Sequence, residues 1–291
     1  MVSEKSKILV VGATGYLGRH VVLASARLGH PTFALVRDTA PSDAAKAAVL
    51  KSFKDAGVTL LKGDLYDHAS LVTAAKAADV VISTLGSLQI GDQTKLIDAI
   101  KEAGNVKPGK FILAGKVAVR RATEASGIPY TFAVAGYFAG YALPNIGQVL
   151  AQGPPVDKAV VLGDGNTKVV YVDEGDIATY TVLAADDPRA ENKTLYIKPP
   201  ANTLSHNELL SLWEKKTGKK FERVYIPDEA VLKQIQESPM PLNIILAIAH
   251  AAYVRGEQAG FEIDPAKGAD ATELYPDVKY TTVDELLDKF L

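Results

Sequence analysis

The chain has no cysteine among its 291 residues. Disulfide bonds, thiolate nucleophiles and cysteine-ligated zinc sites are therefore excluded, and the composition is typical of a reducing compartment. The 5 histidines show no spacing typical of a metal centre, so we expect no metal.

Long apolar runs and an excess of charge are also missing. No apolar stretch reaches membrane-spanning length, and the polar residues 1–7 lack the pattern of a signal peptide. The net charge of −2 argues against nucleic acid or an anionic membrane as partner. We expect a cytoplasmic protein that binds neither. The sequence leaves the oligomeric state open, with a homodimer as one option.

A glycine-rich turn lies between an apolar strand expected at residues 8–11 and a helix expected at 18–29. Its residues are Gly12, Ala13, Thr14, Gly15, Tyr16, Leu17 and Gly18. Gly12 permits the tight turn, Gly15 lets the backbone approach a pyrophosphate, and Gly18 lets the helix pack closely on the strand. The helix N-terminus favours phosphate. We interpret the turn as a dinucleotide site. The alternative is a turn without a ligand.

The second expected strand, residues 31–36, ends at Arg37, where proteins that bind NAD carry an acidic residue for the ribose hydroxyl. A guanidinium instead forks onto a 2′-phosphate. Lys46, on the next expected helix, adds a second positive charge. The pattern favours NADPH. The neighbouring Asp38 keeps NADH as the alternative, and a solvated surface charge is the structural alternative for Arg37.

Short apolar strands alternate with helices through the first half, which predicts an α/β fold with a Rossmann-type parallel sheet covered by helices on both faces. The expected strands are residues 8–11, 32–36, 59–62 and 80–84. The alternation then requires a strand between helices expected at 91–103 and 115–125. Only residues 111–114 qualify, so a central strand is missing or shortened after Lys107.

We expect residues 1–199 to form the NADPH-binding domain. Residues 200–291, with contributions from about 137–170, form a smaller C-terminal α/β substrate domain. Within the second half, the turn at residues 163–166 resembles that of a β-hairpin. Ser205 with Glu208 three residues later predicts a capping box at the start of a helix.

Nearly the whole chain resembles the plant isoflavone reductase-like proteins, and most of all the grass homologues. The matching segments include GATGYLGRH, HPTFALVR, GDLYDHASL, FAGY, VVLGDGN and ELYPDVKYTTVDE. The group consists of atypical, NmrA-like short-chain reductases, among them phenylcoumaran benzylic ether reductases, pinoresinol–lariciresinol reductases and eugenol-forming synthases. The resemblance implies NADPH as cofactor and a small phenolic molecule, derived from phenylpropanoids, as substrate.

The family pattern Lys-x-x-(Val/Ile)-Arg-Arg matches residues 116–121. The resemblance makes Lys116 the catalytic, proton-handling residue and Arg120 a cofactor contact. The two residues are four apart and share one helix face. A guanidinium one turn away, together with burial, would lower the pKa of a lysine. The alternative is a basic, solvated helix face.

Two other patterns offer weaker catalytic candidates. The only Tyr-x-x-x-Lys pair joins Tyr275 to Lys279, and Pro276 makes a continuous helix there unfavourable. We therefore interpret the pair as coincidental. His250 lies on an expected apolar helix, where a hydrogen-bonded core histidine is favoured over a substrate contact.

The chain departs from this family at two places. Relatives carry a strand ending in Pro-Ser-Glu-Phe-Gly and a long loop, where this chain passes directly from Lys107 to Pro108. Either the chain is shortened, which would impair turnover or folding, or residues are missing from the sequence. An intact mass distinguishes the two. Residues 134–136 are Val-Ala-Gly where many relatives have Ser-Ser-Asn, which suggests a different substrate preference.

These observations predict an NADPH-dependent oxidoreductase acting on a phenylcoumaran benzylic ether or an isoflavone- or lignan-like substrate. Lys116 would take the phenol proton, and the resulting quinone-methide-like acceptor would receive the hydride at its benzylic carbon. A non-catalytic NADP(H)-binding redox sensor that acts through partner proteins is the alternative.

Overall fold

The computed structural model describes residues 5–104, 111–113 and 117–291. The chain divides into two compact units. Unit 1 comprises Met1–Val134, Ile177–Tyr196 and Asp264–Ala269, and unit 2 comprises Ala135–Asp176, Ile197–Ile263 and Asp270–Leu291. None of the helices in the described part is both long and apolar enough to cross a membrane.

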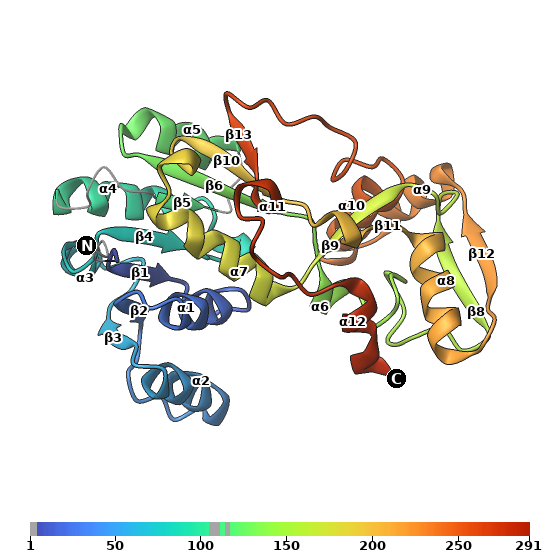
Figure 1. The fold of residues 1–291 in the computed structure, drawn as a ribbon, viewed down its shortest axis with the longest axis horizontal. Coiled ribbons are helices and arrows are strands. Elements are labelled where there is room, and N and C mark those ends of the chain that lie inside the picture. Colours follow the sequence, from blue (N-terminus) through green and yellow to red (C-terminus); the bar gives the residue numbers. More distant parts are fainter. Residues whose placement is uncertain (1–4, 105–110, 114–116) are drawn as a thin grey trace. The chain divides into compact units, whose positions relative to one another are not determined.

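Unit 1 is built on a sheet with the strand order β13-β10-β6-β5-β4-β1-β2-β3 (Figure 1). Neighbouring strands from β6 to β3 pair in parallel. The bounds are β1 (Ile8–Val11), β2 (Thr32–Val36), β3 (Thr59–Lys62), β4 (Val80–Ser83), β5 (Phe111–Leu113), β6 (Tyr130–Ala135), β10 (Lys193–Ile197) and β13 (Gly268–Asp270). The expected Rossmann-type sheet is confirmed.

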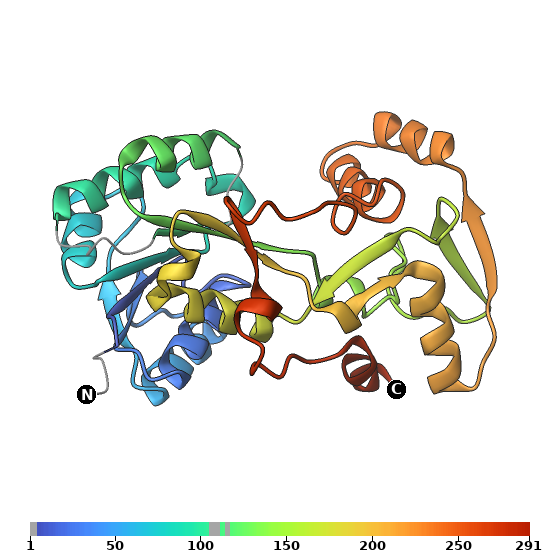
Figure 2. The same cartoon turned by 45° about the horizontal axis from the view of Figure 1, so that its top comes forward.

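Helices cover both faces of this sheet, because successive side chains of a buried strand point to opposite sides. Ile8 and Val10 pack with α1 (Gly18–Arg27), α2 (Ala44–Asp55) and α7 (Glu174–Leu183). Leu9 and Val11 pack with α3 (His68–Lys76), α4 (Gln93–Ala103) and α5 (Val117–Ser126). In Figure 2, α4 and α5 lie on one side of the sheet and α1 and α7 on the other.

The strand expected after Lys107 is present. β5 has three residues and lies between β4 and β6. Its register aligns Val81 with Phe111 and Leu113 with Phe132. The expected central strand is therefore present, and the sheet remains continuous across it. Its shortening stays a prediction, because residues 105–110 and 114–116 lie outside the described part of the chain.

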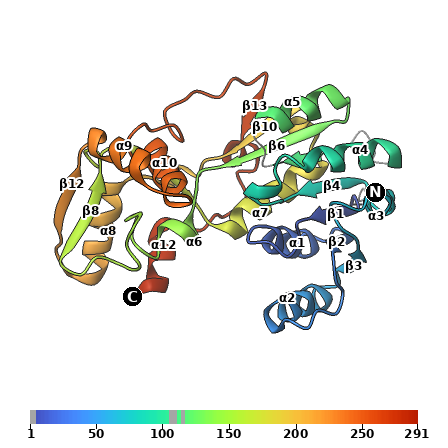
Figure 3. The ribbon, with the colours of Figure 1, turned by 180° about the vertical axis from the view of Figure 1, so that it is seen from behind.

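Unit 2 contains a three-stranded sheet with the order β11-β9-β7 and a parallel pair, β12-β8. Figure 3 shows β8 beside β12, with α8 next to them. Its strands are β7 (Tyr137–Phe138), β8 (Lys158–Leu162), β9 (Lys168–Val172), β11 (Thr203–Ser205) and β12 (Glu222–Ile226). Its helices are α6 (Ala139–Ala142), α8 (His206–Thr217), α9 (Asp228–Glu237), α10 (Leu242–Tyr253), α11 (Ala271–Leu274) and α12 (Val283–Leu287). Tyr171, Trp213 and Tyr253 are among the large residues of its core.

The hairpin predicted around residues 163–166 is wrong. β8 pairs with β12, whereas β9 pairs with β7 and β11. Gly163 and Gly165 do turn the chain, with φ of 64° and 73°. The turn connects strands of two different sheets, however, and not two paired strands of a hairpin. The predicted capping box is confirmed, since the Glu208 N–H donates to Ser205 Oγ and the Ser205 N–H donates to the Glu208 carboxylate.

Candidate functional site

The turn after β1 has a shape that only glycine allows at two positions. Gly12 has φ of +82°, and a Cβ on it would lie 2.9 Å from the backbone carbonyl of Thr84. A Cβ on Gly18 would lie 2.1 Å from Gly12 O. The Gly15 N–H donates to the same oxygen at 2.9 Å. The turn and packing roles predicted for Gly12 and Gly18 are therefore confirmed.

A cavity of about 360 Å³ opens at the carboxyl ends of β1, β2, β3 and β4. This is the edge at which open α/β sheets bind ligands. Predicted site residues in its wall are Gly12, Ala13, Thr14, Gly15 and Arg37. Arg37 directly follows β2, so the short strand itself carries the guanidinium to the cavity.

The last three residues of the glycine turn, Tyr16, Leu17 and Gly18, lie at the start of α1. They do not line the cavity in the described part of the chain. Leu17 occupies the N-cap of α1, and its side chain has no atom that accepts a hydrogen bond. The guanidinium of Arg19 lies 5.4 Å from the ring centre of Tyr16. Tyr16, Leu17 and Gly18 thus shape the start of α1, and their cofactor contacts stay predictions.

The other predicted cofactor residues are more distant from this turn. Lys46 is exposed on the first turn of α2, where its N–H donates to the cap residue Asp43. Arg120 lies on α5 with its guanidinium 5.0 Å from the ring centre of Phe132. Neither is in the cavity wall within the described part of the chain. Lys116 lies outside the described residues, and all three roles stay predictions.

A polar cluster at the cavity was missed by the sequence reasoning. Tyr66 lines the cavity and donates its hydroxyl to Asp92 at 3.0 Å. Lys95 lies 3.0 Å from Asp92 and 4.3 Å from the Tyr66 ring centre. The hydrogen bond to Asp92 raises the pKa of Tyr66, while hydrogen bonds from Lys95 and Tyr66 lower the pKa of Asp92. The only sequence signal was the position of Tyr66 shortly after the third strand.

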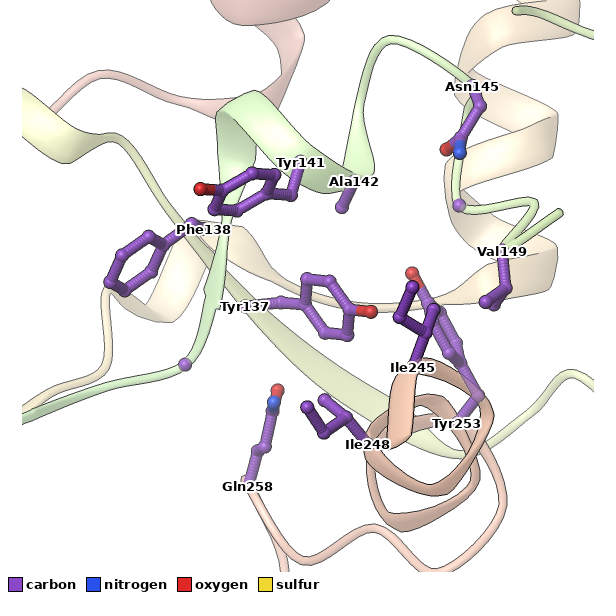
Figure 4. A pocket seen from close by; sticks show the side chains of 12 residues that line it. Tyr137, Phe138, Tyr141, Ala142, Asn145, Val149, Ile245, Ile248, Tyr253 and Gln258 are labelled. Atoms are coloured by element: carbon purple, nitrogen blue, oxygen red, sulfur yellow. The ribbon is translucent and has the colours of Figure 1, made fainter. Parts of the chain in front are cut away.

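Unit 2 contains a second, largely apolar pocket of about 510 Å³ (Figure 4). Its walls come from β7, α6 and the segment after it, and from α10 and the segment after it. The lining side chains of these elements are Tyr137, Phe138, Tyr141, Ala142, Asn145, Val149, Ile245, Ile248, Tyr253 and Gln258. Apolar and aromatic walls with a few polar groups are typical of a site for a small aromatic ligand.

Two tyrosines of this pocket, Tyr137 and Tyr253, stay protonated at neutral pH. Burial raises the pKa of Tyr137 and that of Tyr253. Tyr171 donates to the Tyr253 hydroxyl at 3.3 Å, and the rings of Tyr137 and Tyr253 are 5.8 Å apart. Tyr137 and Tyr253 therefore present neutral hydroxyl groups to the pocket rather than phenolates.

The weaker catalytic candidates have structural explanations. His250 pairs with Asp228 at 2.6 Å, as the preferred interpretation requires. Tyr275 lies beyond the end of α11, so Tyr275 and Lys279 do not share a helix and the pair is coincidental. A Cβ on Gly136 would lie 2.3 Å from Val170 O, so close packing of β7 on β9 requires glycine there.

Comparisons with known proteins place the chain among reductase-like proteins. The NmrA-like family model matches residues 4–287. The isoflavone reductase homolog IRL of Zea mays is 78% identical, with 100% of each chain covered, over 309 residues against 291 here. The maize protein therefore has residues with no counterpart in this chain. Their predicted position after Lys107 stays a prediction.

Relatives with lower sequence identity also match nearly the whole chain. Phenylcoumaran benzylic ether reductase TP7 of Nicotiana tabacum is 56% identical and covers 99% of this chain and 100% of its own. The solved structure of AtPrR2 with NADP+ and (+)-pinoresinol is 38% identical, with a TM-score of 0.90, and covers 99% of this chain and 100% of its own. The chain belongs to the NmrA-like family and, within it, to the isoflavone reductase-like group.

Proposed function

We propose that this protein is an NADPH-dependent reductase of phenylpropanoid-derived phenols. The cavity at the carboxyl ends of β1 to β4 carries the proposal, because it combines a glycine-built turn with Arg37 at the end of β2. The named activities of the relatives support the same class of reaction.

The residues of unit 1 fit a phosphorylated dinucleotide. The backbone of Gly12 to Gly15 would hold the pyrophosphate. The turn requires glycine at position 12, because a side chain there would collide with Thr84. Arg37 would hold the 2′-phosphate through parallel N–H donors. When bound, NADPH supplies the hydride for the reaction.

The pocket of unit 2 would hold the phenolic substrate. Its aromatic walls exclude water around a ligand ring, and the protonated hydroxyl of Tyr137 can donate a hydrogen bond without adding charge. The favoured substrate is a phenylcoumaran with a benzylic ether. Lys116, assigned by family resemblance, would take the phenol proton and return it to the oxygen released by ether cleavage, and the phenolate that remains after reduction would take a proton from solvent.

Turnover of a defined substrate panel tests this function. The protein should oxidise NADPH with a phenylcoumaran, lignan or isoflavone, and mass spectrometry should detect the matching reduced product. Lys116→Ala should lower kcat by about 10²- to 10⁴-fold, the usual contribution of a general acid–base group, and leave NADPH affinity unchanged. NADPH binding without turnover of any panel member would contradict the reductase and favour the redox sensor.

Arg37→Glu should reverse the cofactor preference. The change removes charge-assisted hydrogen bonds to the 2′-phosphate and adds repulsion, so NADPH affinity should fall by about 10- to 100-fold. NADH affinity should remain or rise, as fluorescence titration with both cofactors would show. Arg255→Glu makes the same charge change at an exposed position of unit 2 and should alter neither affinity. An unchanged NADPH-to-NADH ratio in Arg37→Glu would refute the role of Arg37.

A further inference from the structure

One segment in the wall of the unit 2 pocket has an unfavourable backbone conformation. Ile146 is fully buried and has φ of 53°, in the left-handed region that a β-branched residue rarely adopts. Such conformations persist only where surrounding contacts impose them, and they are frequent at ligand sites. The residues on either side of Ile146, Asn145 and Gly147, both line the pocket.

Specific hydrogen bonds hold this turn. His206 Nε2 donates to Ile146 O at 2.9 Å, since a carbonyl can only accept. The Ile146 N–H donates to Leu143 O at 3.0 Å, and the Gly147 N–H donates to Ala142 O at 2.8 Å. The backbone that carries Asn145 is thus fixed from both sides.

The amide of Asn145 has one satisfied end and one unsatisfied end. Nδ2 donates to Ala151 O at 3.3 Å, which fixes the orientation of the amide. Oδ1 is buried and has no hydrogen-bond partner among the described residues. Gln258 Oε1, from the segment after α10, is in the same condition and lines the same pocket (Figure 4). Buried acceptors are normally paired, so two in one pocket indicate a ligand that donates.

The pocket also restricts the charge of that ligand. Within the described part of the chain, its lining residues include no acidic, basic or histidine side chain. A carboxylate or phosphate group would enter without a counter-charge, which is costly in an apolar site. A neutral phenol brings an aromatic ring for the walls and an O–H donor for an amide oxygen.

We propose that Asn145 is a specificity-determining residue whose Oδ1 accepts a hydrogen bond from a free phenolic hydroxyl of the substrate. Gln258 offers a second acceptor for a further hydroxyl group of the same ligand. Phenols whose hydroxyl is capped as an ether leave the oxygen of Asn145 unpaired and bind more weakly. This inference rests on the proposed function and specifies the substrate that the pocket selects.

Equilibrium binding tests the proposal without relying on turnover. The probes are (+)-pinoresinol and its di-O-methyl ether, titrated by calorimetry into the full-length protein saturated with NADP+. The wild-type protein should prefer the free phenol by about 10- to 100-fold, the range for one hydrogen bond to a buried acceptor. In Asn145→Leu this preference should fall to about one- to threefold, mainly because the free phenol binds more weakly.

Ile248→Leu is the matched control, because it alters the same pocket wall without changing a polar atom. It should keep the preference whatever its absolute affinities. Equal binding of both probes by the wild-type protein, or a full preference in Asn145→Leu, would overturn the role of Asn145 and leave the reductase function standing. Binding of neither probe by a protein that reduces other panel members would also overturn it. Failure of the proposed function itself would appear separately, as absence of turnover with the whole panel.

Discussion

Gly18→Ala should destabilise unit 1 and weaken NADPH binding by more than about tenfold. The new Cβ would lie 2.1 Å from Gly12 O and 2.7 Å from Thr84 Oγ1. The Gly12 oxygen cannot easily retreat, because Gly15 donates to it and Gly12 itself has φ of +82°. Helix α1 must therefore move away from β1, at a cost of about 1–3 kcal/mol for overpacking. Urea denaturation and NADPH fluorescence titration measure the two effects.

Two other glycines separate the collision from general effects of substitution. Gly91 has an ordinary φ and no atom within 4 Å of a built Cβ, so Gly91→Ala should leave stability and NADPH affinity unchanged. Gly57 also has open space but φ of +78°, so Gly57→Ala should cost only the backbone strain, about 1 kcal/mol. Wild-type stability and affinity in Gly18→Ala would show that the close packing is not required.

His206 should make the protein sensitive to mild acid. Burial lowers its pKa from the ordinary 6.5 to about 4, and the nearby Arg223 acts in the same direction. Between these two values the unfolded chain binds a proton that the folded protein does not. The contribution of His206 to stability is therefore complete above about pH 6.5 and declines as the pH falls toward 4. The loss amounts to about 3 kcal/mol.

His206→Gln should flatten this part of the pH profile. The glutamine amide can donate to Ile146 O but does not titrate, so the difference in unfolding free energy between variant and wild type should change by about 3 kcal/mol from pH 7 to pH 4. Carboxylates that titrate in the same range are common to both proteins and cancel in the difference. A pH-independent difference for His206→Gln would contradict the assignment.

Local patterns predicted the cofactor half of the molecule well. The glycine turn, the short strands β1 to β4 and the position of Arg37 at the end of β2 each depend on a few adjacent residues. The capping box at Ser205 is local in the same way. The alternation of strands and helices also requires a strand after Lys107, and β5 occupies that position between β4 and β6.

Errors and omissions arose where distant segments decide the structure. The turn after β8 looked like a hairpin, yet β8 found its partner in β12, more than fifty residues further along the chain. The contacts of Tyr66 with Asp92 and Lys95 join segments that are distant in the sequence, so no local pattern predicts them.

The sequence by itself determined the dinucleotide turn, the strand-and-helix alternation and the family. The turn and the alternation follow from steric and apolar patterns within a few residues, which act in any tertiary context, whereas the family follows from the resemblance of segments along nearly the whole chain. Only the tertiary structure decided the aromatic pocket, the burial of His206 and the unpaired oxygens of Asn145 and Gln258. Whether a polar atom is satisfied depends on every segment packed around it, and Asn145 and Gln258 are more than a hundred residues apart in the chain.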